Sequence, residues 1–180
     1  MATRSGLGVV VALRGSWEVP VFAGRWEVGL VGVDLPAQPY HAAAGLGPAA
    51  AQEVIGRAGR GAAEAAAAGL RAVAGGWPAA SAVFGVAVAV KVVSVPASVA
   101  DVLRSHAWMH AAEGVLYREA VLAAAQQCGW PAHAVDVSLL PAGEGVLAAL
   151  GRAAGRPWRR IEKDAAGAAL TLLPRRPGPP

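Results

Sequence analysis

The sequence predicts a single α/β domain. Its 180 residues fall within the usual span of one compact domain, and no linker divides them before the last few positions. Residues 7–13 and 83–90 are β-branched runs that are apolar on both faces, which is typical of central strands covered on both sides. Between and after these runs lie two long Ala-rich segments, residues 48–74 and 98–127. Strands that alternate with helices in this way indicate an α/β fold.

The first third of the chain predicts three strands. Residues 7–13 form the first strand. Residues 17–22 and 25–33 alternate large apolar with polar side chains on either side of Ala23-Gly24, which is the pattern of a hairpin. The prolines at positions 36 and 39 then exclude regular structure, because proline lacks an amide donor and biases its predecessor to extended backbone.

The central part predicts a long helix, a strand and a second long helix. Residues 48–74 form an Ala-packed helix that can approach a sheet closely, although each internal glycine weakens it by roughly 1 kcal/mol. Residues 83–90 form the strand. Ser98 is the expected N-cap of the second helix, which runs to Gln127. A repeat every seven residues marks the inward face of this helix: Val102, Met109, Leu116 and Ala123.

The last part predicts a short strand over residues 133–140, a brief helix over 146–153 and a closing helix over 158–173. The domain therefore spans residues 1–173. Residues 174–180 have the composition of a disordered, basic, proline-rich tail.

Composition and cysteine content point to a cytoplasmic protein. Cys128 is the only cysteine, so no internal disulfide is possible. The longest apolar stretch is cut at Lys91 and is too short to cross a bilayer, which predicts a soluble chain without a membrane partner. The net charge of +4 favours a polyanion partner, although the same excess of Arg, with Ala, Gly and Pro, would arise in any G- and C-rich genome.

The order of three strands, a helix, a strand, a long helix, a strand and a final helix resembles the ribonuclease H-like fold. Ribonuclease H, the Holliday-junction resolvases and transposase cores share that architecture. The resemblance covers residues 6–173 and implies a mixed five-stranded sheet with helices on both faces, in which residues 9–13 and 86–90 are adjacent parallel strands. The chain is also similar to a bacterial family with a His-x-x-x-His-x-x-Glu-Gly helix and a Lys-Asp-Ala helix, here residues 106–114 and 163–165.

The ribonuclease H-like resemblance implies a set of carboxylates that hold two divalent metal ions for phosphodiester cleavage. Acids are expected in the first strand, at the end of the fourth strand and on the last helix. Here the first strand has none, and Lys91 ends the strand over residues 83–90. Glu162 and Asp164 remain, but they point about 200° apart on a helix, so only one can face the site. Asp164 is the candidate catalytic acid, and a contact with Arg160 is the alternative.

The second long helix carries a polar stripe. His106, His110, Glu113 and Tyr117 are spaced by four, three and four residues, so their side chains follow one face beside the inward one. His106, His110 and Glu113 could together ligate a divalent metal ion. Two alternatives stay open: an acid–base pair of His110 and Glu113, or structural hydrogen bonds to loops. His41, before the first helix, is either a fourth ligand or a turn contact.

Basic residues gather near the C-terminus. Arginine next to an aromatic ring suits phosphate contact with base stacking, which makes this segment a candidate nucleic-acid interface. A solvated helix face is the alternative. The candidate residues are Arg156, Trp158, Arg159 and Arg160.

These features predict a nucleic-acid-associated protein with an incomplete catalytic carboxylate set, acting as a binding or accessory module. The alternatives are a metal-dependent hydrolase or nuclease that uses the His-x-x-x-His-x-x-Glu helix, and a protein-interaction scaffold. Whether the chain is an enzyme is left open, and so is homo-oligomer formation. The phosphate-binding loop, the dinucleotide fingerprint and the serine-hydrolase elbow are absent from the sequence.

Overall fold

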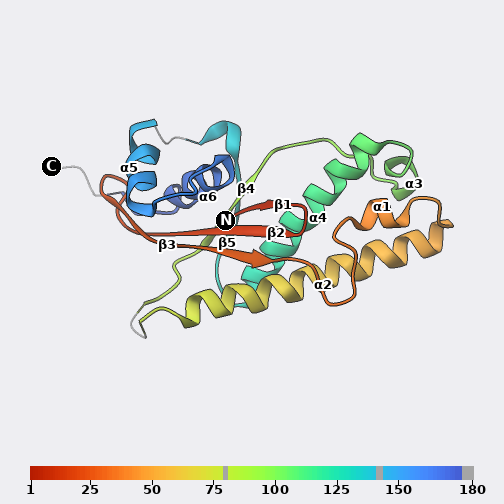
Figure 1. Ribbon diagram of the computed structural model, residues 1–180, viewed down its shortest axis with the longest axis horizontal. Helices are drawn as coiled ribbons and strands as arrows, with labels where there is room; N and C mark the ends of the chain where they lie inside the picture. Colours follow the sequence, from red (N-terminus) through yellow and green to blue (C-terminus); the bar gives the residue numbers. More distant parts are fainter. Residues whose placement is uncertain (79–80, 141–143, 176–180) are drawn as a thin grey trace.

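A computed structural model describes residues 1–78, 81–140 and 144–175 of the chain (Figure 1). The residues expected to form the tail lie mostly outside these ranges. Within the described ranges, none of the helices combines the length and the apolar character needed to cross a membrane.

The N-terminal strands form an antiparallel sheet in the order β1-β2-β3, from β1 (Ala2–Arg4), β2 (Leu7–Gly15) and β3 (Pro20–Gly29). Ala12 pairs with Gly24 and Leu13 pairs with Phe22, so Ala23 is an extra residue in β3. The expected hairpin around Ala23-Gly24 is therefore wrong. The break at Ala23-Gly24 is a bulge inside one continuous strand, which bends β3 without ending it.

A separate parallel sheet contains β4 (Val86–Val90) and β5 (Ala132–Asp136). The expected five-stranded ribonuclease H-like sheet is therefore wrong, and so is the pairing of residues 9–13 with 86–90. The reason lies at the N-terminus, where Met1 N donates to Ala87 O (2.6 Å) and Ala89 N donates to Met1 O (2.8 Å). Because Met1 occupies that edge of β4, β2 pairs with β1 and β3 alone.

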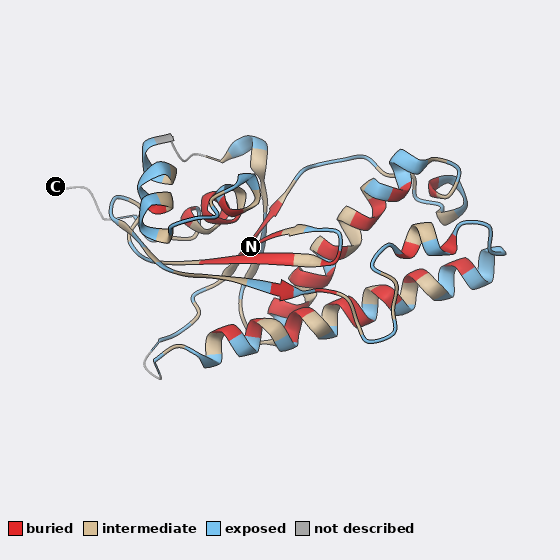
Figure 2. Cartoon of the chain, in the orientation of Figure 1, coloured by how far each residue is buried: buried red, intermediate tan, exposed pale blue. Residues whose placement is uncertain are grey.

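The helices pack on both faces of β2. Val10 belongs to a core cluster with Leu70 of α2 (Pro48–Gly75) and Val121 of α4 (His106–Gln127). Val9 and Val11 point the other way, into a cluster with α5 (Glu144–Ala154) and α6 (Arg160–Leu170). Figure 2 shows buried residues along β2, α2 and α4. The prediction of a strand covered on both faces is confirmed for β2.

The remaining elements are short. They are α1 (Pro39–Ala43), α3 (Val99–Val102) and the 3-10 helix η1 (Val137–Leu139). The sequence predicted one helix over residues 98–127, but the chain is extended at Ser105, whose side chain accepts from Trp108 N and caps a new helix. This cap places His106 in the first turn of α4.

Candidate metal centre

Three histidines converge where α1 meets the N-terminal half of α4. His41 is the third residue of α1, which begins with a proline at its first position. His106 and His110 lie one turn apart on α4, on the same side of the helix. The two helices are in contact, and this contact brings an imidazole from the first quarter of the chain to two from the middle.

The three imidazoles are close enough to share one ion. Each offers a nitrogen, and these nitrogens all lie within 4.8 Å of one another. The ring centroids are separated by 5.0 Å for His41 and His106, 4.5 Å for His41 and His110, and 4.4 Å for His106 and His110. A tetrahedral zinc ion with bonds of about 2.0 Å holds its nitrogens about 3.3 Å apart, so small side-chain rotations would close the cluster around it.

Glu113 lies behind this cluster, and only 2% of its surface is exposed. Its Oε1 accepts a hydrogen bond from Nδ1 of His41 at 2.8 Å and a longer one from the His41 backbone amide at 3.4 Å. The second carboxylate oxygen is 3.7 Å from Nδ1 of His110. An ionised carboxylate only accepts hydrogen bonds, so it places the His41 proton on Nδ1 and leaves the Nε2 lone pair free.

Two buried polar atoms of this cluster have no hydrogen-bond partner within the described residues. They are Nε2 of His41 and Oε2 of Glu113. Buried polar atoms are rarely left without a partner, because each one forfeits its hydrogen bonds to water. A metal ion on Nε2 would satisfy the first atom. Glu113, His41 and the metal would then form a carboxylate–histidine–metal arrangement, in which the carboxylate orients the histidine ligand.

Tyr117, one turn beyond Glu113, fixes the segment that leads into α1. Its hydroxyl donates to the backbone oxygen of Ala37 at 2.7 Å, and its side chain is buried. Burial, and secondarily the charge of Glu113, raise the pKa of Tyr117 to about 12. One helix thus supplies two imidazoles, the carboxylate that orients the third and the tether of the loop before it.

The structure rearranges the ligand set expected from the sequence. His106 and His110 are together, as their spacing predicts, but Glu113 contacts His41 and stands behind the three imidazoles. The polar stripe also enters the core, because Glu113 and Tyr117 are buried while Leu116 is only half-buried. The seven-residue repeat is therefore confirmed only in part: Val102 and Met109 are buried, whereas Leu116 and Ala123 are half-buried. Glu113 accepts a hydrogen bond from α1 and Tyr117 donates one to the loop before it, as expected if the polar stripe makes structural hydrogen bonds to loops.

Asp164 and the C-terminal arginines lie on or near α6. Nε of Arg160 donates to Oδ1 of Asp164 at 2.7 Å, which is the contact expected as the alternative to a catalytic role. Arg156 is exposed. Trp158 packs edge-on against Phe22 with ring centroids 6.4 Å apart, and its ring also fills the space next to Gly151. Its partly buried ring leaves little surface for base stacking, and nucleic-acid binding by this segment stays a prediction.

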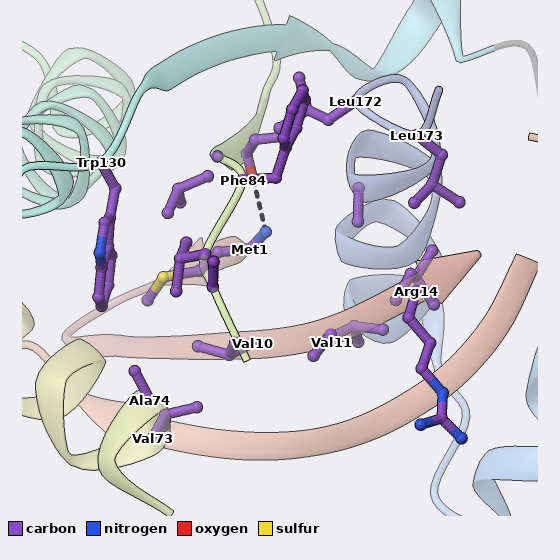
Figure 3. A pocket seen from close by; sticks show the side chains of 18 of the residues that line it. Met1, Val10, Val11, Arg14, Val73, Ala74, Phe84, Trp130, Leu172 and Leu173 are labelled. Carbon is purple, nitrogen blue, oxygen red and sulfur yellow. Dashed lines mark hydrogen bonds between the residues drawn. The ribbon is translucent and has the colours of Figure 1, made fainter. Parts of the chain in front are cut away.

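An apolar cavity of about 340 Å³ lies elsewhere in the molecule, between β2, the end of α2 and the segment before β4 (Figure 3). Val10, Phe84, Trp130 and Leu172 line it, and so do Met1 and Ala87, whose hydrogen bond is drawn in Figure 3. Burial lowers the pKa of the Met1 amine to about 5. None of the histidines of the cluster lines this cavity, so it is separate from the candidate metal centre.

Comparisons of the chain with family models, with curated proteins and with solved structures gave no match. The functional argument therefore depends on the geometry of the side chains.

Proposed function

We propose that the chain binds one divalent transition-metal ion through His41, His106 and His110. The observation that carries this proposal is the state of His41. Its Nδ1 is held by Glu113, and its Nε2 is buried without a partner in the described part of the chain, beside two further imidazoles. A core histidine with only a packing role would have its second nitrogen satisfied or exposed to water.

The ligand chemistry selects the class of ion. Imidazole nitrogen suits Zn²⁺, Cu²⁺, Ni²⁺ and Fe²⁺, whereas Mg²⁺ and Ca²⁺ require oxygen ligands. The only group of three or more metal-ligating side chains found among the described residues consists of histidines. The site therefore favours a zinc-like ion over the magnesium-like ions that a carboxylate set would hold.

Solvent access leaves room for a further ligand. His106 is exposed, and 46% of the His110 side chain is accessible, so the side of the cluster away from Glu113 faces water. Three protein ligands plus one open position is the pattern of catalytic zinc sites, in which the ion supplies a water of pKa about 7. This supports a metal-dependent hydrolase as the second candidate function, with Glu113 as the residue that orients His41.

The test is a metal titration of protein that was purified without an affinity tag and treated with chelator. Co²⁺ replaces zinc-like ions and reports tetrahedral nitrogen coordination through its visible absorption, and competition with Zn²⁺ then gives the zinc affinity. We expect one ion per chain, with affinity that falls as the pH is lowered because protons compete for imidazole. His41→Ala and His110→Ala should each abolish the absorption.

His133→Ala is the matched control, because His133 is an exposed histidine on β5 outside the cluster. It should bind cobalt as the unmodified chain does. The proposal is overturned if His41→Ala binds as tightly as the control, or if the unmodified chain takes up far less than one ion per molecule. Circular dichroism of each variant verifies that the helices remain.

A further inference from the structure

A basic pocket of about 460 Å³ lies where β1, the ends of β4 and β5, and the start of α6 meet. Residues from five separate parts of the sequence line it. The charged members are Arg4, Lys91, Arg118, Arg159, Arg160 and Asp164. Five cations and one anion give this lining a formal charge of +4. A biased composition explains the number of arginines in the chain but not their convergence on one hollow.

Local ion pairs neutralise only part of this charge. Arg160 is paired with Asp164, and Nη2 of Arg159 is 3.6 Å from Oε1 of the buried Glu162. Arg4 and Lys91 form no ion pair with any residue in the described ranges. Like charges that face one hollow repel one another, so an anion bound there would relieve the repulsion.

Two backbone features define the position of the pocket. Helix α6 begins at Arg160 beside the pocket, but the Glu162 carboxylate already accepts a hydrogen bond from the Arg159 amide there (2.7 Å), so the side chains supply the uncompensated positive charge. Lys91 follows the last residue of β4, and Val137 follows the last residue of β5, so the pocket lies at the carboxyl ends of the parallel pair. Ligands of α/β proteins commonly bind at this edge of a sheet.

The lining also indicates the form of the anion. Each phosphate of a linked chain carries about one to two negative charges at neutral pH, so the lining charge of +4, or +3 once Glu162 is counted against Arg159, matches two or three phosphate groups. Single-stranded nucleic acid is usually bound along a basic groove with aromatic rings on which bases stack. The described lining of this pocket contains no aromatic ring, and its cations surround one hollow.

We propose that this basic pocket binds a compact ligand with two or three linked phosphate groups, as in inorganic triphosphate or the polyphosphate chain of a nucleotide. Arg4 and Lys91 are its principal phosphate contacts, because neither forms an ion pair with a residue in the described ranges. Arg118 supplies a half-buried guanidinium from α4. The pocket shares no residue with the histidine cluster, so this inference does not depend on the metal centre.

The test is calorimetric titration of the full chain with inorganic triphosphate at low salt, with chelator present to keep the metal centre empty. Arg4→Gln combined with Lys91→Gln should weaken binding about tenfold or more, because charge-assisted contacts to phosphate are lost. The matched control is Arg57→Gln combined with Arg152→Gln. It makes the same change in net charge at exposed positions outside the pocket. It should change the affinity less than about twofold.

Nuclear magnetic resonance of the unmodified chain gives an independent readout if the double variant is unstable. Triphosphate should shift the amide signals of Thr3, Lys91 and Ile161, which line the pocket, and leave that of His110 unchanged. Adenosine triphosphate in place of inorganic triphosphate distinguishes a nucleotide from a free polyphosphate, and either result supports the proposal. Equal losses in both double variants, amide shifts elsewhere, or preferential binding of a mixed-sequence oligonucleotide would overturn it.

Discussion

Glu113 of α4 and His41 of α1 are 72 residues apart in sequence and joined by a 2.8 Å hydrogen bond. Burial of a carboxylate is costly unless its oxygens are paired. Here Oε1 is held by His41, while Oε2 has no hydrogen-bond partner among the described residues and lies 3.7 Å from Nδ1 of His110. The contact therefore joins two helices and also orients an imidazole. Both consequences can be measured separately, because the first concerns folding and the second concerns metal affinity.

Glu113→Gln keeps the shape of the side chain and removes its charge. We expect metal affinity to fall by about 10- to 100-fold, as it does when outer partners of histidine ligands are changed. The measurement is the cobalt titration with zinc competition. Glu53→Gln, at an exposed position of α2, is the control and should leave the affinity unchanged. Unaltered affinity in a folded Glu113→Gln protein would show that the carboxylate has only a structural role.

Tyr117→Phe removes the hydrogen bond to Ala37 and leaves a carbonyl without its partner. We expect the free energy of unfolding to fall by about 0.5–1.5 kcal/mol in urea denaturation. Tyr40→Phe is the comparison, because the half-buried Tyr40 donates no hydrogen bond to any residue that the structure describes. An equal loss of unfolding free energy in both variants would mean that the hydrogen bond to Ala37 does not stabilise the fold.

The same tyrosine predicts a stability change in alkali. The folded chain raises the pKa of Tyr117 to about 12, whereas an unfolded chain has a tyrosine pKa of about 10. Above pH 10 the unfolded state therefore loses this proton first. The stabilisation is complete below about pH 10 and is lost as the pH rises through about 12. Tyr117→Phe should flatten the decline of unfolding free energy across this window, and parallel profiles for both proteins would contradict the assignment.

A strand could be predicted where its own residue pattern reflects how it is buried. Val9, Val10 and Val11 are apolar in succession because helices cover both faces of β2. Strand β1 was missed because three residues ending in Arg4 carry no such pattern, and its role depends on the backbone of Met1. Without β1, residues 86–90 were assigned to the wrong neighbour.

The candidate site was predictable only where its residues are neighbours in sequence. The spacing of His106 and His110 is a local signal on one helix. His41 joins them through a long-range contact, and nothing near it in the sequence distinguishes a ligand from a turn residue. Glu113 is buried because it contacts His41, and this contact is also long-range. The sequence shows only the spacing of Glu113 from His110, so it predicts a direct ligand.

Glycines in α2 provide a test of how closely this helix approaches the sheet. A Cβ atom added at Gly69 would lie 2.2 Å from Cγ1 of Val28, which is buried in β3. Valine has few alternative rotamers, so the helix would have to move away. Gly69→Ala should therefore be destabilising, because overpacking costs about 1–3 kcal/mol and exceeds the gain of up to about 1 kcal/mol in helix propensity.

Gly56→Ala is the matched variant in the same helix. Its added Cβ would meet only the end of the Arg60 side chain, at 3.5 Å, so the helix gains propensity without a clash. We expect the free energy of unfolding to rise by up to about 1 kcal/mol. Urea denaturation of the two variants should thus give changes of opposite sign. If both substitutions stabilise the chain, α2 does not approach Val28 closely enough to require glycine at position 69.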